Sequence, residues 1–153
     1  LGARLIINLE KLYLSLKKLE LKTSNIEDYY NLSHKLGISQ IDNLELQNKI
    51  FGIECNFEEL NGIDFQKGCY VGQENTARIK LKNKLNKKLF PIKIIEGNIS
   101  SDEIFLEDKE IGKLLIKNKN PFALIKIQNN LLNFDIIYKC GSAKIKVIKP
   151  DWL

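Results

Sequence analysis

Six short apolar runs in the second half of the sequence constrain its fold more than any other feature. Each run has the length of a strand and is rich in Ile, Leu, Phe and Val, which favour strands. The runs cover 88–95, 103–107, 110–117, 122–128, 134–139 and 143–148. Turn-forming residues separate them. Six strands in roughly 60 residues predict a small closed β-barrel, because closure removes exposed strand edges.

The part before the predicted barrel should contain two helices. Ser24 or Asn25 can cap a helix over 25–36, because their side chains accept hydrogen bonds from free amides, and Gly37 can end it. A second helix is expected over 73–81, where apolar residues recur at four-residue steps. The other segments are predicted as a strand over 3–9, a charged solvent-exposed connection over 11–22 and a loop held by its apolar side chains over 40–66.

The composition favours a soluble protein kept inside the cell. Apolar residues make up 44% of the chain and charged residues 28%, which is typical of globular proteins. There is no run of about 18 apolar residues and no basic-then-apolar leader. The three Cys give no disulfide framework and indicate a reducing compartment. Without a Cys-x-x-Cys pair, Cys55 and Cys140 are predicted to be packing residues. The absence of Met and the abrupt apolar start predict a fragment of a longer protein.

Residues 67–74, Lys-Gly-Cys-Tyr-Val-Gly-Gln-Glu, concentrate chemically specialised side chains. Gly68 and Gly72 allow a sharp turn or the close approach of a ligand. Cys69 is predicted at the entrance to the 73–81 helix, where free amides and the nearby Lys67 would favour the thiolate. A lone Cys is as often a small buried apolar residue. Spacing alone leaves a reactive thiol and an inert one equally open.

The octapeptide resembles the Lys-Gly-Cys-Tyr-x-Gly-Gln-Glu signature of the YgfZ family, folate-binding relatives of the glycine-cleavage aminomethyltransferase (GcvT) that support iron–sulfur proteins. Flanking residues also agree with the family pattern, namely Glu54, Asn56, Leu60, Phe65, Ala77 and Arg78. The resemblance implies an α+β fold, with the C-terminal part of a GcvT-like folate-binding domain over 1–83, a small β-barrel over 84–149 and a tail over 150–153. It further implies that the family's N-terminal portion is missing.

The resemblance implies an accessory factor for iron–sulfur cluster assembly or repair and for tRNA modification, and it favours a non-enzymatic role. Cys69 would be the reactive thiol, assisted by Lys67. The other implied site residues are Tyr70, Gln73, Glu74 and Arg78 around the cofactor and loop, and Gly68 and Gly72 at the turn. The implied cofactors are tetrahydrofolate and a transient iron–sulfur cluster. The implied partners are iron–sulfur proteins or their assembly factors, and the location is the cytoplasm, or the mitochondrial matrix in a eukaryote. No complete metal site is predicted, because a cluster normally takes about four ligands.

One alternative is a folate-dependent one-carbon transferase. The aminomethyltransferases carry a carboxylate near the end of the predicted 25–36 helix, where it helps to hold the pteridine ring. This chain has Ser33, His34 and Lys35 there, and a Lys ammonium has donors but no acceptor. This alternative therefore needs a carboxylate from elsewhere. His34, the only histidine, is predicted to be a surface or half-buried imidazole.

A second alternative is a tRNA-binding module that uses a basic run over 78–93. The run contains seven Lys and Arg residues and no acid, more than the net charge of +5 on the whole chain. Clustered cations can contact phosphates without sequence specificity. The same run also fits a solvent-exposed lysine-rich face, so both interpretations stay open.

Overall fold

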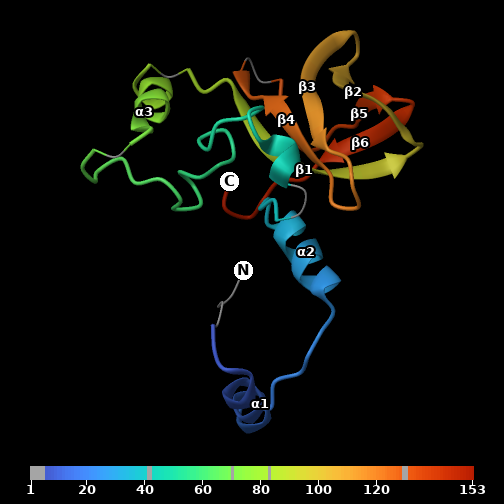
Figure 1. The fold of residues 1–153 in the computed structure, drawn as a ribbon. Coiled ribbons are helices and arrows are strands. Elements are labelled where there is room, and N and C mark those ends of the chain that lie inside the picture. The colour runs from blue at the N-terminus through green and yellow to red at the C-terminus, as the bar shows by residue number, and fades with distance from the viewer. Residues whose placement is uncertain (1–5, 41–42, 70, 83, 129–130) are drawn as a thin grey trace.

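The computed structural model describes residues 6–40, 43–69, 71–82, 84–128 and 131–153 (Figure 1). The elements before the barrel are α1 (Leu9–Lys18), α2 (Ile26–Lys35), the 3-10 helix η1 (Asn43–Leu46) and α3 (Gln73–Leu81). The strands are β1 (Lys87–Glu96), β2 (Ile99–Leu106), β3 (Lys109–Ile116), β4 (Phe122–Lys126), β5 (Tyr138–Gly141) and β6 (Ala143–Val147). No described helix is long and apolar enough to cross a bilayer.

The six strands form a closed antiparallel barrel, as predicted, in the order β1-β4-β3-β2-β5-β6. Two strands differ clearly from their predicted bounds: β2 begins at Ile99, whereas a strand was expected over 103–107, and β5 begins at Tyr138, whereas a strand was expected over 134–139. The segment before β5 forms a loop instead of a strand. The Tyr138 hydroxyl accepts a hydrogen bond from the Asn133 amide and donates one to the Asn133 carbonyl, both at 2.7 Å. These bonds hold the chain in a loop at Asn133, immediately before the segment that was expected to be a strand.

The barrel core follows from side-chain alternation. In β6, Ala143, Ile145 and Val147 are buried inside, whereas Lys144 and Lys146 point outward. Residues of all six strands meet in one interior cluster, and they are Phe90, Ile92, Ile104, Ile111, Leu114, Ala123, Ile125, Tyr138, Cys140, Ala143, Ile145 and Val147. Burial of this apolar surface supplies the main stabilisation of the barrel.

A second apolar cluster joins the barrel to the segment before it. Leu89, Leu115, Ile116, Phe122 and Leu124 are buried, and Leu46, Ile50 and Cys55 pack against them. The Leu89 amide donates to the Glu54 carbonyl at 2.8 Å, and the Leu89 carbonyl accepts from the Asn56 side chain at 2.7 Å. Strand β6 pairs with β1 only from Ile92 onward. The loop thus covers the part of β1 that β6 does not reach, which agrees with the predicted loop over 40–66.

Helix α2 agrees with the helix predicted over 25–36. The Asn25 side chain caps it by accepting from the Glu27 amide at 3.1 Å, and Gly37 follows with a left-handed φ of 71°. The C-terminal tail docks at this helix end, since the Trp152 indole donates to the Leu36 carbonyl at 2.7 Å. The tail over 150–153 therefore contacts the end of α2 through Trp152.

The strand predicted over 3–9 is wrong where the structure describes it. Residues 6–8 are not in a strand, and α1 begins at Leu9, while residues 1–5 lie outside the described part. The Asn8 side chain caps α1 by accepting from the Glu10 amide at 2.9 Å. The connection predicted over 11–22 is accordingly helical as far as Lys18. None of the residues of α1 is buried, and Figure 1 shows it apart from the barrel.

His34 is the half-buried packing residue that was predicted. Its Nε2 lies 2.9 Å from the Pro121 carbonyl oxygen, and its ring meets Phe122 edge-on at 5.1 Å between centroids. Burial lowers the pKa of His34, although hydrogen bonds to the Pro121 and Ile92 carbonyls partly offset this effect. The imidazole therefore docks α2 on the barrel in its neutral form.

This burial predicts a loss of stability in mild acid. An unfolded chain protonates His34 near its ordinary pKa of about 6.5, whereas the folded protein resists protonation until a lower pH. The contribution of His34 is thus fully present above about pH 6.5 and is lost as the pH falls through the folded pKa. Denaturant unfolding at pH 7.5 and 5.5 measures it. His34→Gln keeps a donor for Pro121 but does not titrate, so an unchanged pH dependence in this variant would contradict the prediction.

Candidate functional site

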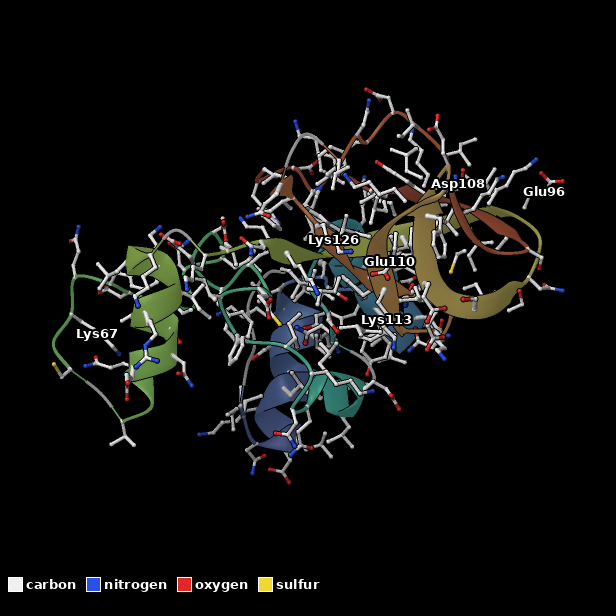
Figure 2. The ribbon with its side chains drawn as sticks, turned by 90° about the horizontal axis from the view of Figure 1, so that it is seen from above. Lys67, Glu96, Asp108, Glu110, Lys113 and Lys126 are labelled. Carbon is white, nitrogen blue, oxygen red and sulfur yellow. The ribbon has the colours of Figure 1, made fainter. Side chains whose placement is uncertain are left out.

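Of the signature, residues 67–69, 71 and 72 lie in an exposed loop that leads into α3, and Gln73 and Glu74 belong to the first turn of that helix. Figure 2 shows Lys67 beside α3, on the opposite side of the molecule from Glu96 at the far end of the barrel. Cys69 is exposed and lies three residues before Gly72, the N-cap of α3. The thiol was expected at the helix entrance, and it lies in the loop that leads there, outside α3 itself. Tyr70 lies outside the described residues.

The two signature glycines differ in what they contribute. Gly72 adopts a left-handed conformation with φ of 87°, which a side chain would strain, and it starts α3 without a side-chain cap. A Cβ at Gly68 would meet no heavy atom within 4 Å. Backbone conformation therefore requires glycine at Gly72, whereas Gly68 leaves open space beside the loop.

Two ion pairs involve residues of α3. Arg78 pairs with Glu74 one helical turn away, and both side chains are exposed. Lys80 pairs with Glu58 and places its ammonium 5.4 Å from the centre of the Phe65 ring. The contact between Lys80 and Glu58 joins residues 22 positions apart, and no local sequence pattern pointed to it. It ties the helix that carries the signature to the loop that covers β1.

The three cysteines have different environments. Burial, with Glu54 nearby, raises the pKa of Cys55 to about 11. Cys140 is buried in the barrel core, burial raises its pKa, and its thiol donates to the Ser101 carbonyl at 3.2 Å. Both positions disfavour the thiolate, which is the reactive form. Cys69 alone among the three is exposed to solvent.

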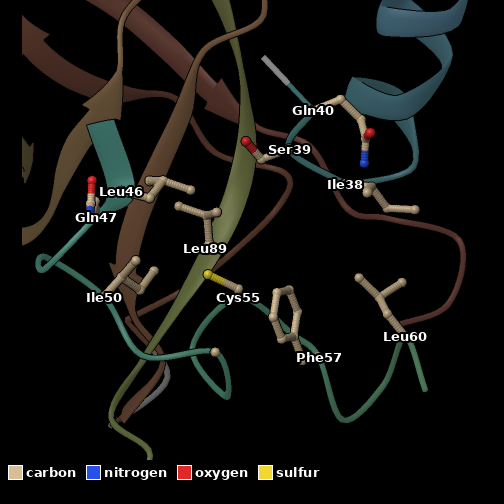
Figure 3. A pocket seen from close by; sticks show the side chains of 12 residues that line it. Ile38, Ser39, Gln40, Leu46, Gln47, Ile50, Cys55, Phe57, Leu60 and Leu89 are labelled. Carbon is tan, nitrogen blue, oxygen red and sulfur yellow. The ribbon is translucent and has the colours of Figure 1, made fainter. Parts of the chain in front are cut away.

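A cavity of about 480 Å³ lies between the second apolar cluster and the end of α2 (Figure 3). The side chains that line it and are labelled in Figure 3 are Ile38, Ser39, Gln40, Leu46, Gln47, Ile50, Cys55, Phe57, Leu60 and Leu89. Most of these side chains are apolar, and the neutral Cys55 thiol faces them. No local sequence pattern marks this cavity, because its lining residues come from separate segments at 37–40, 46–47, 50–60 and Leu89.

Three of the four residues expected at tetrahydrofolate lie on one face of α3, whereas the fourth, Tyr70, lies outside the described residues. Gln73, Glu74 and Arg78 line a shallow depression of about 380 Å³ together with Ala77, Leu81 and Lys82. An amide, a carboxylate and a guanidinium together offer donors and acceptors that suit a polar ring edge. All six lining residues belong to α3 or its C-cap. Within the described part of the chain, these residues form one wall of such a site and do not enclose a ligand.

Comparison with known proteins shows which proteins this chain resembles. The chain matches no model of a protein family. It is 33% identical over 108 residues to the mitochondrial iron-sulfur cluster assembly factor IBA57 homolog of Dictyostelium discoideum, covering 70% of this chain and 26% of that protein. The Candida albicans homolog is 30% identical over 115 residues, with 72% and 24% covered. IBA57 of Mus musculus is 35% identical over 81 residues, with 52% and 22% covered.

These matches cover most of this chain or about half of it, but only a small part of each relative. The chain spans about a quarter of the length of the curated relatives it matches. All three relatives carry the same name, and the similarity agrees with the resemblance drawn from the octapeptide at 67–74. The chain therefore belongs to the YgfZ family, which includes the iron-sulfur cluster assembly factor IBA57.

Proposed function

We propose that this chain is part of an iron–sulfur cluster assembly factor in which Cys69 is the reactive group. The observation that carries the proposal is the exposure of Cys69 within the family signature, while Cys55 and Cys140 are protected. The names of the relatives support the assembly role and a mitochondrial location. Because the chain spans about a quarter of those relatives, the activity belongs to the longer protein.

The proposed chemistry is that of a single accessible thiol. Thiolates ligate iron and attack sulfur electrophiles, and an exposed loop lets a partner approach the sulfur closely. One thiolate supplies one of the roughly four ligands that a cluster takes. A cluster passing through this site must therefore keep ligands from an iron–sulfur protein or another assembly factor, and these are the proposed partners.

Tetrahydrofolate and tRNA modification enter the proposal only through the family resemblance. The α3 face with Gln73, Glu74 and Arg78 would form one wall of a folate site. A non-enzymatic role is proposed, with folate-dependent transfer as the enzymatic alternative. The other alternative, a tRNA module over 78–93, is weakened because Arg78, Lys80 and Lys88 pair with Glu74, Glu58 and Glu59. The run is therefore not a continuous free cationic face.

Replacement of Cys69 tests the proposal. Full-length protein carrying Cys69→Ala or Cys69→Ser is expected to lose at least tenfold in restoring iron–sulfur enzyme activity to cells that lack their own factor. Folding should be unaffected, because the side chain is exposed. Val71→Ala, in the same loop and fully exposed, is the matched control and should restore activity. Full restoration by Cys69→Ala would rule out the assignment, and unfolding of this variant would favour a packing role.

A further inference from the structure

A row of lysines on the outside of the barrel has no part in the proposed function. Lys93 of β1 lies directly opposite Lys146 of β6, and Lys144 of β6 lies opposite Lys139 of β5. Lys149 follows shortly after β6. Among the ion pairs of the described residues, only Lys144 of this set has a partner, Glu96 at 2.7 Å. Four of the five lysines thus face solvent without a carboxylate.

This arrangement is unfavourable for the isolated barrel. Opposite residues on antiparallel strands have Cβ atoms about 4.5–5.5 Å apart, and like charges at that separation destabilise a sheet. The repulsion is unrelieved between Lys93 and Lys146, whereas between Lys139 and Lys144 the Glu96 carboxylate beside Lys144 offsets part of it. A bound anion would remove it, because each ammonium would gain an opposite charge.

Three of the lysines also line a hollow. Lys93, Lys146 and Lys149 surround a space of about 650 Å³ with Leu132, Asn133, Phe134, Asp135, Val147 and Ile148. Asp135 is the only carboxylate among these lining residues, so the hollow carries a net positive charge. We call this hollow, with the adjoining Lys139 and Lys144, the lysine groove.

The wall of the lysine groove opposite β6 is held firmly. The Tyr138 hydroxyl bonds to both backbone groups of Asn133, and the Asn133 side chain accepts from the Asp135 amide at 2.8 Å. The Phe134 ring packs edge-on against Phe90 of the core at 5.6 Å between centroids. The loop is therefore shaped before any ligand arrives, which lowers the entropic cost of binding.

We propose that the lysine groove binds the phosphate backbone of a single-stranded nucleic acid. Neighbouring strands lie about 4.8 Å apart, so the lysines form a row about 10 Å long rather than converging on one anion. Ammonium groups are point charges that contact phosphates without sequence preference. The half-exposed Phe134 and Leu132 offer apolar contact for bases at the edge of the row. An extended polyanion with flat apolar bases matches these features better than an acidic protein surface.

The cations of the basic run over 78–93 differ in their partners. Three of its cations are paired within the chain, whereas Lys93 joins Lys146, which lies 53 positions later, through strand pairing. The free positive charge is assembled by the barrel and not by the consecutive sequence.

Fluorescence anisotropy with a labelled oligouridylate of about 12 nucleotides tests the proposal. Intact protein should bind, and its affinity should fall with salt. The double variant Lys93→Glu with Lys146→Glu should bind at least tenfold more weakly, with a log–log salt slope shallower by about 1.4, two contacts at 0.7 each. Lys109→Glu with Lys113→Glu is the matched control, because it changes the charge equally on β3, two strands from β1 and three from β6 around the barrel. This control should lose less than threefold.

Several outcomes would overturn the proposal. Equal weakening by both double variants would mean that net charge alone drives binding. Binding of polyglutamate but not of oligouridylate would assign the groove to an acidic protein instead. The double variant Lys93→Ala with Lys146→Ala is a second test in case the Glu variants do not fold. Because it removes the repulsion between the two lysines, its unfolding midpoint should be unchanged or higher. Wild-type affinity in this well-folded variant would also overturn the proposal.

Discussion

Gly112→Ala is expected to destabilise the protein by about 3 kcal/mol, because the barrel has no room for a side chain there. Gly112 lies in β3, opposite Ile104 of β2 on one side and Ile125 of β4 on the other. A Cβ would lie 2.5 Å from the Leu124 carbonyl oxygen and 3.1 Å from the Ile125 Cα atom. Both are backbone atoms held by strand pairing, so the clash can be relieved only by separating β3 from β4.

Denaturant unfolding followed by circular dichroism measures this effect. Gly68→Ala is the matched control, since its new methyl group would meet nothing within 4 Å, and it should change the free energy of unfolding by less than about 0.5 kcal/mol. A Gly112→Ala variant as stable as the parent would show that β3 and β4 are farther apart than described here.

Asn56→Ala is expected to cost about 2–4 kcal/mol and to loosen the joint between the signature segment and the barrel. The Asn56 side chain is buried and donates to the Leu89 carbonyl at 2.7 Å. Removing it leaves that carbonyl without a partner, which costs about 1–3 kcal/mol. Asn56 also has a left-handed φ of 62°, which Ala tolerates less well than Asn and which adds about 1 kcal/mol.

Asn56→Gly separates the two contributions. Glycine accepts the left-handed conformation freely, so this variant should lose only the hydrogen bond and be more stable than Asn56→Ala by about 1 kcal/mol. Equal stability of the two variants would mean that backbone strain contributes nothing. If a protease cuts the Asn56→Ala variant faster within 50–65 while the barrel core stays folded, the contact between this segment and β1 opens locally.

These two positions bear on the proposed function in different ways. Gly112 sets the integrity of the barrel and therefore of the lysine groove on its outside. Asn56 connects β1 to the segment that leads to Cys69, and Lys88 strengthens the same connection through its pair with Glu59. A variant of Asn56 can therefore affect the signature loop while the barrel stays folded.

Local signals predicted the elements whose stability is local. The alternation in β6 indicates an inward and an outward face, and the caps at Asn25 and Gly37 mark both ends of α2. Such patterns act within a few residues, so the sequence displays them directly. Helix α1 was missed, because its Leu and Lys pattern fits both helix and strand and no partner decides between them.

The sequence by itself determined that the barrel has six strands, that a helix follows the signature, and to which family the chain belongs. Only the tertiary structure decided what these residues contact: Trp152 meets Leu36 across 116 positions, Asn56 meets Leu89 across 33, and Lys93 faces Lys146. It also decided that Cys69 is exposed, a question that spacing alone left open, and it confirmed the prediction that Cys55 and Cys140 pack against apolar side chains. The physical reason is that hydrophobic periodicity fixes which face of a strand is buried, whereas strand order and loop packing choose the neighbours on the outside.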